Sequence, residues 1–229
     1  MLEPKKGLSQ ETLKIIACIT MLIDHIGAVL FPSIRLLRII GRIAFPIFCF
    51  LLVEGVYHTK HPVKYGFRLC IGLLLAEIPF DILFFGGFTW QHQSVMVTLL
   101  LGYIMLQIIM KVEPIYKILI VFLFAMLADL FNTDYGSFGI CLIAIFMLTR
   151  ETKYNILIQA ISICLLSILF YGINSTELFC IFALLFIVLY SDKKVTYSKV
   201  LQWAFYLFYP VHLTLLALVN YLLTYMRGI

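Results

Sequence analysis

Long apolar stretches follow one another along almost the whole chain, and they limit the possible folds more than any other feature. Hydrophobic residues make up 63% of the 229 residues and charged residues only 13%, which lies far outside the usage of soluble domains. Backbone polar groups inside a bilayer must be satisfied within the chain itself, and the stretches lack the alternating pattern of barrel strands. We therefore expect an all-α, polytopic transmembrane helical bundle.

About nine membrane spans are expected from the polar boundaries between these stretches. The first stretch is interpreted as a retained span and not as a cleaved signal peptide, because Asp24 and His25 interrupt it and no small-residue cleavage site follows. Residues 1–229 are expected to form a single membrane domain. The expected spans are 11–31, 38–57, 66–85, 95–111, 115–131, 137–149, 154–171, 176–190 and 200–225.

Basic residues concentrate in every second predicted loop. Such loops face the cytoplasm in membrane proteins, so the amino terminus is expected to be cytoplasmic as well. The formal net charge of +5 is explained by this orientation signal, and no nucleic-acid partner is expected. The basic residues are Lys60, Lys64 and Arg68, then Lys111 and Lys117, then Arg150 and Lys153, and finally Lys193, Lys194 and Lys199.

Three arginines break this alternation, because they follow the first span on the side that should face outward. Arg35, Arg38 and Arg42 are spaced by three and four residues, which puts them on one face of a helix. They are either snorkelling side chains at the membrane interface or groups held there for anionic or carbonyl partners.

A cation and a histidine share one face of the first span. Lys14 and His25 are 11 residues apart, which brings them to nearly the same helix face at roughly 16 Å along the axis. Ionisable groups inside a span are candidates for a functional site, because their isolation in hydrocarbon is costly. Glu54, Glu77 and Asp81 lie in the next two spans, and the arginines and His25 are their expected partners.

His25 can be a general base, a proton relay or a histidine satisfied by core contacts. Asp24 is its neighbour in sequence and should point elsewhere, so Glu54 or Glu77 is expected to hold the imidazole. His212 follows Pro210 in the last span, where a structural hydrogen bond is one interpretation. No metal site is expected, because the cysteines lack ligand spacing and suit packing. They are Cys18, Cys49, Cys70, Cys141, Cys164 and Cys180.

Several sequence blocks resemble the TraX family, membrane proteins linked with acetylation of the amino terminus of conjugative F-pilin. The most specific block is GRIAFPIFCFLLVEG within residues 38–59. Shorter blocks are DHIGAVLF at 24–31, KYGFRL at 64–69, EIPFD at 77–81 and FYPVHLTLL at 208–216. The chain also resembles the broader group of transmembrane acyltransferases, which carry a basic residue and a histidine on the first helix at this spacing.

These resemblances imply a membrane-embedded acyltransferase in the inner membrane of a bacterium. His25 would be the catalytic base, and cytoplasmic acetyl-CoA would thread its thioester into the bundle. The acceptor would be an amine or hydroxyl of a pilin, another peptide or a glycan. The expected catalytic group is His25, Asp24, Glu54, Glu77, Arg38 and Arg42; the donor-binding group is Lys14, Lys64 and Arg68; the substrate-binding group is Arg35, Asp81 and His212.

Two other functions use the same residue types. A small-molecule or proton-coupled transporter also needs intramembrane histidine, carboxylate and arginine side chains, although the ionisable residues here concentrate in the first three spans and do not recur as an inverted repeat. A noncatalytic assembly factor for pili or conjugation would use them at interfaces. Binding of acetyl-CoA separates the acyltransferase from both.

Overall fold

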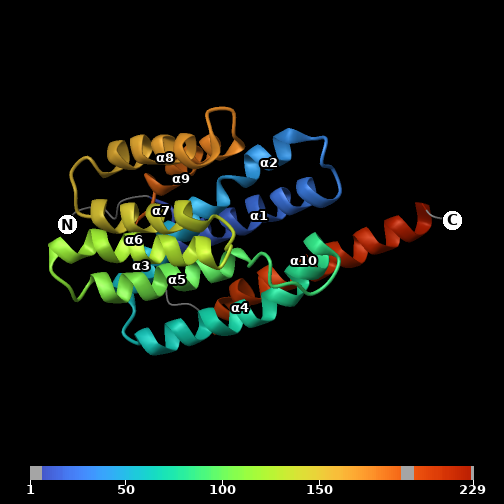
Figure 1. Cartoon of the computed structure of the whole chain (residues 1–229), viewed down its shortest axis with the longest axis horizontal. Coiled ribbons are helices and arrows are strands. Elements are labelled where there is room, and N and C mark those ends of the chain that lie inside the picture. Colours follow the sequence, from blue (N-terminus) through green and yellow to red (C-terminus); the bar gives the residue numbers. More distant parts are fainter. Residues whose placement is uncertain (1–6, 192–198, 228–229) are drawn as a thin grey trace.

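The computed structural model describes residues 7–191 and 199–227, of which Lys199 and Arg227 are described by backbone alone. Within these ranges the chain is helical, with isolated β-bridges between Leu8 and Tyr190 and between Gln93 and Thr133. The helices lie side by side along the long axis of the molecule (Figure 1). They are α1 (Gln10–Val29), α2 (Arg35–Gly41), α3 (Ala44–His58), α4 (Pro62–Phe85), α5 (Val95–Ile109), α6 (Pro114–Leu130), α7 (Gly136–Thr149), α8 (Asn155–Tyr171), the 3-10 helix η1 (Thr176–Ala183), α9 (Leu184–Ile187) and α10 (Lys199–Arg227).

These elements make nine passes within the described ranges, because two pairs of them are continuous. Helices α2 and α3 join at Arg42 and Ile43 into one apolar segment, Arg35–His58, and η1 joins α9 in Thr176–Ile187. In the described part of the chain, three helices are long and apolar enough to cross a membrane, namely Gln10–Val29, Arg35–His58 and Val200–Met226, and shorter apolar helices accompany them. The predicted all-α transmembrane bundle is confirmed, and the chain is a multi-pass membrane protein.

The two ends of the bundle differ in charge. We call the end with the loops at 59–61, 110–113 and 150–154 the basic end, because Lys60, Lys111, Arg150 and Lys153 lie there. The opposite end has the loops at 30–34, 86–94, 131–135 and 172–175 (Figure 1). The predicted grouping of the basic loops is confirmed for these residues, whereas the assignment of the basic end to the cytoplasm stays a prediction. Lys193 and Lys194 lie outside the described residues.

Local chemistry explains where several helices begin and end. Ser9 caps α1 by accepting a hydrogen bond from the backbone N–H of Thr12 at 3.2 Å, which satisfies one of the free N–H groups of the first turn. Pro62 and Pro114 occupy the first turns of α4 and α6, where a missing N–H costs nothing. Gly86 ends α4 with a φ of +75°, a conformation that glycine adopts without strain.

The core lies where α3, α5 and α7 meet. Ile47, Met105 and Ile143 are fully buried there, one on each helix. Helices α6, α8 and α10 instead leave many large apolar side chains exposed, which suits surfaces that face lipid tails. This arrangement leaves α1, α2 and α4 to form the walls of the polar site.

Candidate functional site

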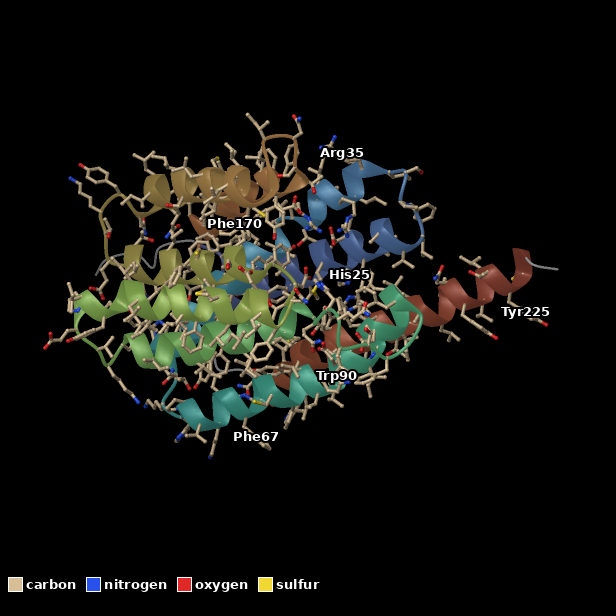
Figure 2. All side chains as sticks on the ribbon, viewed as in Figure 1. His25, Arg35, Phe67, Trp90, Phe170 and Tyr225 are labelled. Atoms are coloured by element: carbon tan, nitrogen blue, oxygen red, sulfur yellow. The ribbon has the colours of Figure 1, made fainter. Side chains whose placement is uncertain are left out.

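A cavity of about 310 Å³ lies near the opposite end of the bundle, between α1, α2, α3 and α4. Its polar lining comes from distant parts of the sequence, and His25 marks its position in Figure 2. Apolar rings of Phe45, Phe80 and Phe84 complete the walls. The polar lining residues are Asp24, His25, Arg38, Arg42, His92 and Asp134.

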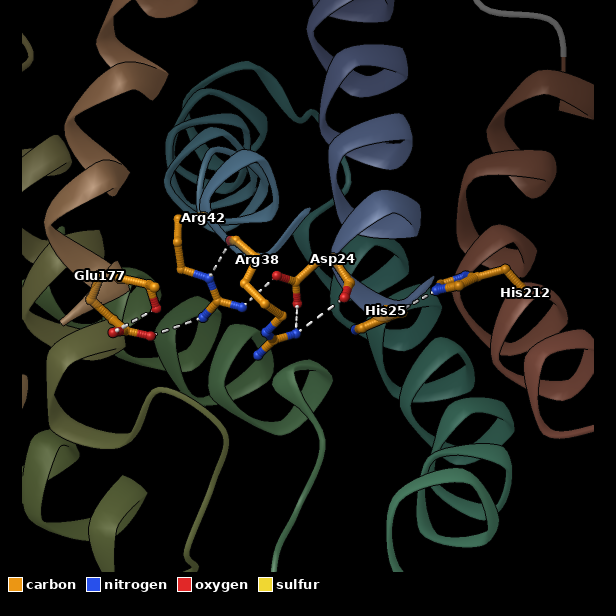
Figure 3. Close-up of polar contacts among 7 residues, drawn as sticks. Asp24, His25, Arg38, Arg42, Glu177 and His212 are labelled. Carbon is orange, nitrogen blue, oxygen red and sulfur yellow. Dashed lines mark hydrogen bonds and ion pairs between the residues drawn. The ribbon is translucent and has the colours of Figure 1, made fainter. Parts of the chain in front are cut away.

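Asp24 is the centre of a buried ion-pair network. Arg38 donates from Nη1 to its Oδ2 at 2.5 Å, and Arg42 donates from Nη2 to its Oδ1 at 2.6 Å (Figure 3). Arg42 also donates from Nη1 to Oε1 of Glu177, in the 3-10 helix η1, at 3.0 Å. The network therefore holds two carboxylates and two guanidinium groups, and its formal charge is balanced.

A glycine makes room for this network. A Cβ built on Gly41 would lie 2.0 Å from Oδ1 of Asp24, so only glycine allows α2 to approach the Asp24 carboxylate so closely. Arg42 follows directly in sequence and is 6% exposed. The close contact between α1 and α2 thus places the arginine pair against Asp24.

His25 forms a pair with His212 of α10. Nδ1 of His25 lies 2.7 Å from Nε2 of His212, and Nδ1 of His212 lies 2.7 Å from the carbonyl oxygen of Phe208 (Figure 3). The two imidazole planes are inclined by only 10°. The rings of Phe84 and Tyr209 stand 5.7 and 5.9 Å from the His25 ring. The sequence predicted that a carboxylate holds the His25 imidazole, whereas in the structure the imidazole of His212 holds it.

A second, larger cavity of about 840 Å³ extends toward the basic end. Lys14, Lys60 and Arg68 are its cationic lining residues. Aromatic rings accompany them: Nζ of Lys14 lies 5.4 Å from the centre of the Phe205 ring, and the Arg68 guanidinium lies 5.9 Å from that of Tyr206. The expected cation cluster is brought together for Lys14 and Arg68, both of which line this cavity.

The two cavities adjoin each other. Met21, Phe48 and Val95 line both of them, and α1 runs along both, with Lys14 in the wall of one and His25 in the wall of the other. The region that these three side chains line is called the neck below. The cationic cavity and the cavity lined by His25 are therefore neighbours, with the apolar neck between them.

Glu54 and Glu77 do not reach His25, and the expectation that either holds the imidazole is wrong. Glu54 lies near the basic end of α3, where Arg150 donates to it from Nε at 2.8 Å. Glu77 accepts hydrogen bonds from the backbone N–H and the hydroxyl of Ser94, at 3.0 and 2.7 Å. Each carboxylate is therefore satisfied by donors other than His25, as a charge removed from water requires.

Three further residues lie apart from the cavities. Arg35 donates to the carbonyl oxygen of Asn174 at 2.9 Å on the surface, and Asp81 is fully buried and accepts from the N–H of Thr89 at 3.0 Å. Lys64 is exposed in the first turn of α4. Arg35, Asp81 and Lys64 line neither of the two cavities, so the expected substrate and donor contacts of these residues lack geometric support.

Sequence reasoning missed several polar residues of the site. Glu177 pairs with Arg42, and Asp134 lines the cavity beside His25; burial raises the pKa of the Asp134 carboxyl. Asp134 lies in one loop without Lys or Arg, and Glu177 lies just after another. Both loops are at the same end as Arg35, Arg38 and Arg42. The occurrence of these two acids at the same end as three arginines was the sequence feature that could have identified them as partners. Within the described ranges, no three His, Cys, Asp or Glu side chains are grouped to hold a metal ion.

The fold and the site together define a class: a multi-pass helical membrane protein with charged cavities and a histidine pair inside the bundle. A sequence model of the TraX protein family matches residues 9–220. The chain therefore belongs to the TraX family, as the sequence blocks predicted.

Two curated proteins are similar to the chain. A probable fimbrial assembly protein FimC, serogroup H1, of Dichelobacter nodosus is 31% identical over 240 aligned positions, which cover 89% of this chain and 92% of that protein. An uncharacterized protein of Rickettsia prowazekii (strain Madrid E) is 41% identical over 75 residues, which cover 33% of this chain and only 28% of that protein. No solved structure matches the chain.

Proposed function

We propose that the protein transfers an acetyl group from acetyl-CoA, bound from the basic end, to an acceptor at the opposite end of the bundle. The observation that carries this proposal is the pair of adjoining cavities, one with a cationic lining toward the basic end and one lined by His25, which share the residues of the neck. In this reading the basic end faces the cytoplasm of a bacterial cell. A donor made inside the cell then serves an acceptor outside it.

The larger cavity suits the nucleotide part of the donor. Its cations, Lys14, Lys60 and Arg68, offer charge-assisted contacts to phosphate oxygens, and its tyrosine and phenylalanine rings offer stacking surfaces for a base. The rise of α1 from Lys14 to His25 is roughly 16 Å. That length supports an extended pantetheine arm that passes the neck and brings the thioester to His25.

His25 and Arg38 supply the chemistry at the thioester. His25 takes a proton from the acceptor nitrogen as this nitrogen attacks the carbonyl carbon, and Arg38, which lines the same cavity, stabilises the negative charge on the carbonyl oxygen. The carbon–sulfur bond then breaks, and the thiolate of coenzyme A leaves. The proton passes from His25 to the sulfur, so the products are the acetylated amine and the free thiol.

The acceptor is proposed to be the amino terminus of a pilin-type subunit. The namesake of the TraX family acetylates F-pilin, and the similar protein of Dichelobacter nodosus is named as a probable fimbrial assembly protein. Both point to extracellular fibres, and the smaller cavity lies at the end of the bundle where such a subunit would arrive.

The first test is calorimetric binding of acetyl-CoA to the detergent-purified protein and to three variants. The double variant Lys14→Ala/Arg68→Ala is expected to weaken binding by about 10-fold or more, because charge-assisted phosphate contacts are lost. Lys64→Ala is the matched control, since Lys64 lies outside the cavity lining, and it should bind as the wild type does. His25→Ala should also bind normally.

The second test measures transfer. The protein is incubated with acetyl-CoA and a synthetic peptide with a free amino terminus, and the peptide is examined by mass spectrometry for the gain of one acetyl group. His25→Ala should abolish the gain, and a peptide blocked at its amino terminus should show none. A folded protein that binds no acetyl-CoA would overturn the proposal and favour a transporter or an assembly factor. Transfer retained by His25→Ala would remove His25 as the base.

A further inference from the structure

The hydrogen bonds of the histidine pair fix the proton positions on both rings. A carbonyl oxygen can only accept, so the 2.7 Å contact between Nδ1 of His212 and the carbonyl of Phe208 requires that Nδ1 of His212 carries a proton. A neutral His212 then has a lone pair on Nε2. The His25 atom that faces this lone pair, Nδ1 at 2.7 Å, must therefore donate.

The consequence for His25 is that its other ring nitrogen is the basic one. With the proton on Nδ1, a neutral imidazole keeps its lone pair on Nε2. The two rings are inclined by 10° and their centres lie 5.0 Å apart, which with the 2.7 Å contact between the two nitrogens places the rings nearly end to end. The Nδ1–H bond of His25 therefore lies close to the plane of the His212 ring and points along its lone pair. His25 also lines the smaller cavity, where an acceptor would need a base.

We propose that His212 is a positioning residue that holds His25 in the Nδ1–H tautomer, so that Nε2 is the atom that accepts the proton. This inference rests on the proposed function for its role in transfer. When Nε2 of His25 becomes protonated, the Nδ1–H bond to His212 becomes charge-assisted and therefore stronger. His212 thus favours the protonated state that the base passes through, without contacting the reacting atoms.

Other groups around His25 do not replace His212 in this role. Asp24 is occupied by Arg38 and Arg42, and His92 and Asp134 line the same cavity without a hydrogen bond to His25 among the described contacts. After His212, the nearest aromatic rings are those of Phe84 and Tyr209, whose centres lie 5.7 and 5.9 Å from the centre of the His25 ring. Among the described residues, the hydrogen bond that involves Nδ1 of His25 is the one with His212.

The decisive experiment is nitrogen NMR of the detergent-purified protein with ¹⁵N-labelled histidine, the His25 signals being assigned by their loss in His25→Gln. In the wild type, the His25 ring should show a protonated Nδ1 and an unprotonated Nε2. His212→Ala should convert this to a mixture of tautomers, and His212→Gln should preserve it, because the amide oxygen can accept from Nδ1. His92→Ala removes another imidazole from the same cavity and should leave the His25 signals unchanged.

Kinetics with acetyl-CoA and the free-amino peptide supply the second readout. His212→Ala should lower kcat by about 10²- to 10⁴-fold, the usual cost of a lost or misplaced base, with KM for acetyl-CoA unchanged, and His212→Gln should recover most of kcat. A protonated Nε2 on His25 in the wild type would overturn the proposal, even where His212→Ala fails to fold. The predicted tautomer in a protein that transfers no acetyl group would instead leave the pair intact and remove the proposed function.

Discussion

At the scale of single residues, the site depends on charges that balance inside the bundle. Asp24 and Glu177 face Arg38 and Arg42, and the side chains of Asp24 and Arg42 are only 10% and 7% exposed. Removal of one partner from such a buried group leaves an uncompensated charge, which costs about 3–5 kcal/mol. The network therefore constrains stability as well as the shape of the cavity.

Asp24→Asn is expected to lower the free energy of unfolding by about 3–5 kcal/mol, because Arg38 loses its charged partner and Arg42 keeps only Glu177. Thermal unfolding in detergent measures the change. Arg35→Gln is the control, since Arg35 makes its hydrogen bond at the surface and its loss should cost little. Equal stability of the two variants would show that the network contributes nothing to the fold.

Asp134 gives the protein a pH-dependent stability with a defined sign. Burial raises the pKa of its carboxyl above the ordinary value, so the ionised form is less stable in the folded protein than in the unfolded chain. Asp134→Asn should therefore raise the unfolding temperature at pH 7, and this gain should shrink as the pH falls through the raised pKa. The exposed Glu151→Gln should have no such effect, and a gain that is constant with pH would contradict the assignment.

At the scale of helices, the sequence predicted which segments are helical and which ends share a side, but not their partners. Apolar length and loop charge are properties of each segment, and they located the nine passes. Contacts between two segments cannot be predicted from the composition of either segment. Glu54 and Arg150 are 96 positions apart in the sequence, and His25 and His212 are 187 positions apart. The roles of Glu54 and Glu77 were misassigned because the sequence does not show their actual donors, Arg150 for Glu54 and Ser94 for Glu77.

The contact between α1 and α2 can be tested at Gly41. Gly41→Ala would bring a Cβ to 2.0 Å from the Asp24 carboxylate, and such overpacking costs about 1–3 kcal/mol. We expect a lower unfolding temperature together with loss of transfer, because the arginines no longer meet Asp24. Gly87→Ala is the matched control, since a Cβ there meets nothing within 4 Å. A stable, active Gly41→Ala protein would show that α2 can shift freely.

At the scale of the whole molecule, the proposed function assigns donor binding and acetyl transfer to the two cavities, which follow one another along the bundle. Charged groups that suit a phosphate-bearing donor lie toward the basic end, His25, Arg38 and Arg42 lie toward the opposite end, and the neck lies between the two groups. Substitutions at the neck should therefore separate binding from transfer.

Met21→Trp is expected to fill the neck. Binding of acetyl-CoA should remain within a few-fold of the wild type, whereas acetyl transfer should fall by about 10-fold or more, equivalent to at least about 1.4 kcal/mol of barrier. Ile19→Trp on the same helix is the control, because Ile19 is 52% exposed on the outside of the bundle. Parallel calorimetry and peptide mass spectrometry measure both quantities, and unimpaired transfer by Met21→Trp would exclude a route through the neck.

The neck also bears on the membrane that surrounds the protein. A water-filled passage of this length would conduct protons and dissipate the electrochemical gradient of the cell. Met21, Phe48 and Val95 offer no strong hydrogen-bonding group to a chain of water molecules, so the route of the proposed function has an apolar barrier to protons at the neck. Under the proposed function, a cell would thus export the reactivity of a thioester while its membrane keeps its electrical resistance.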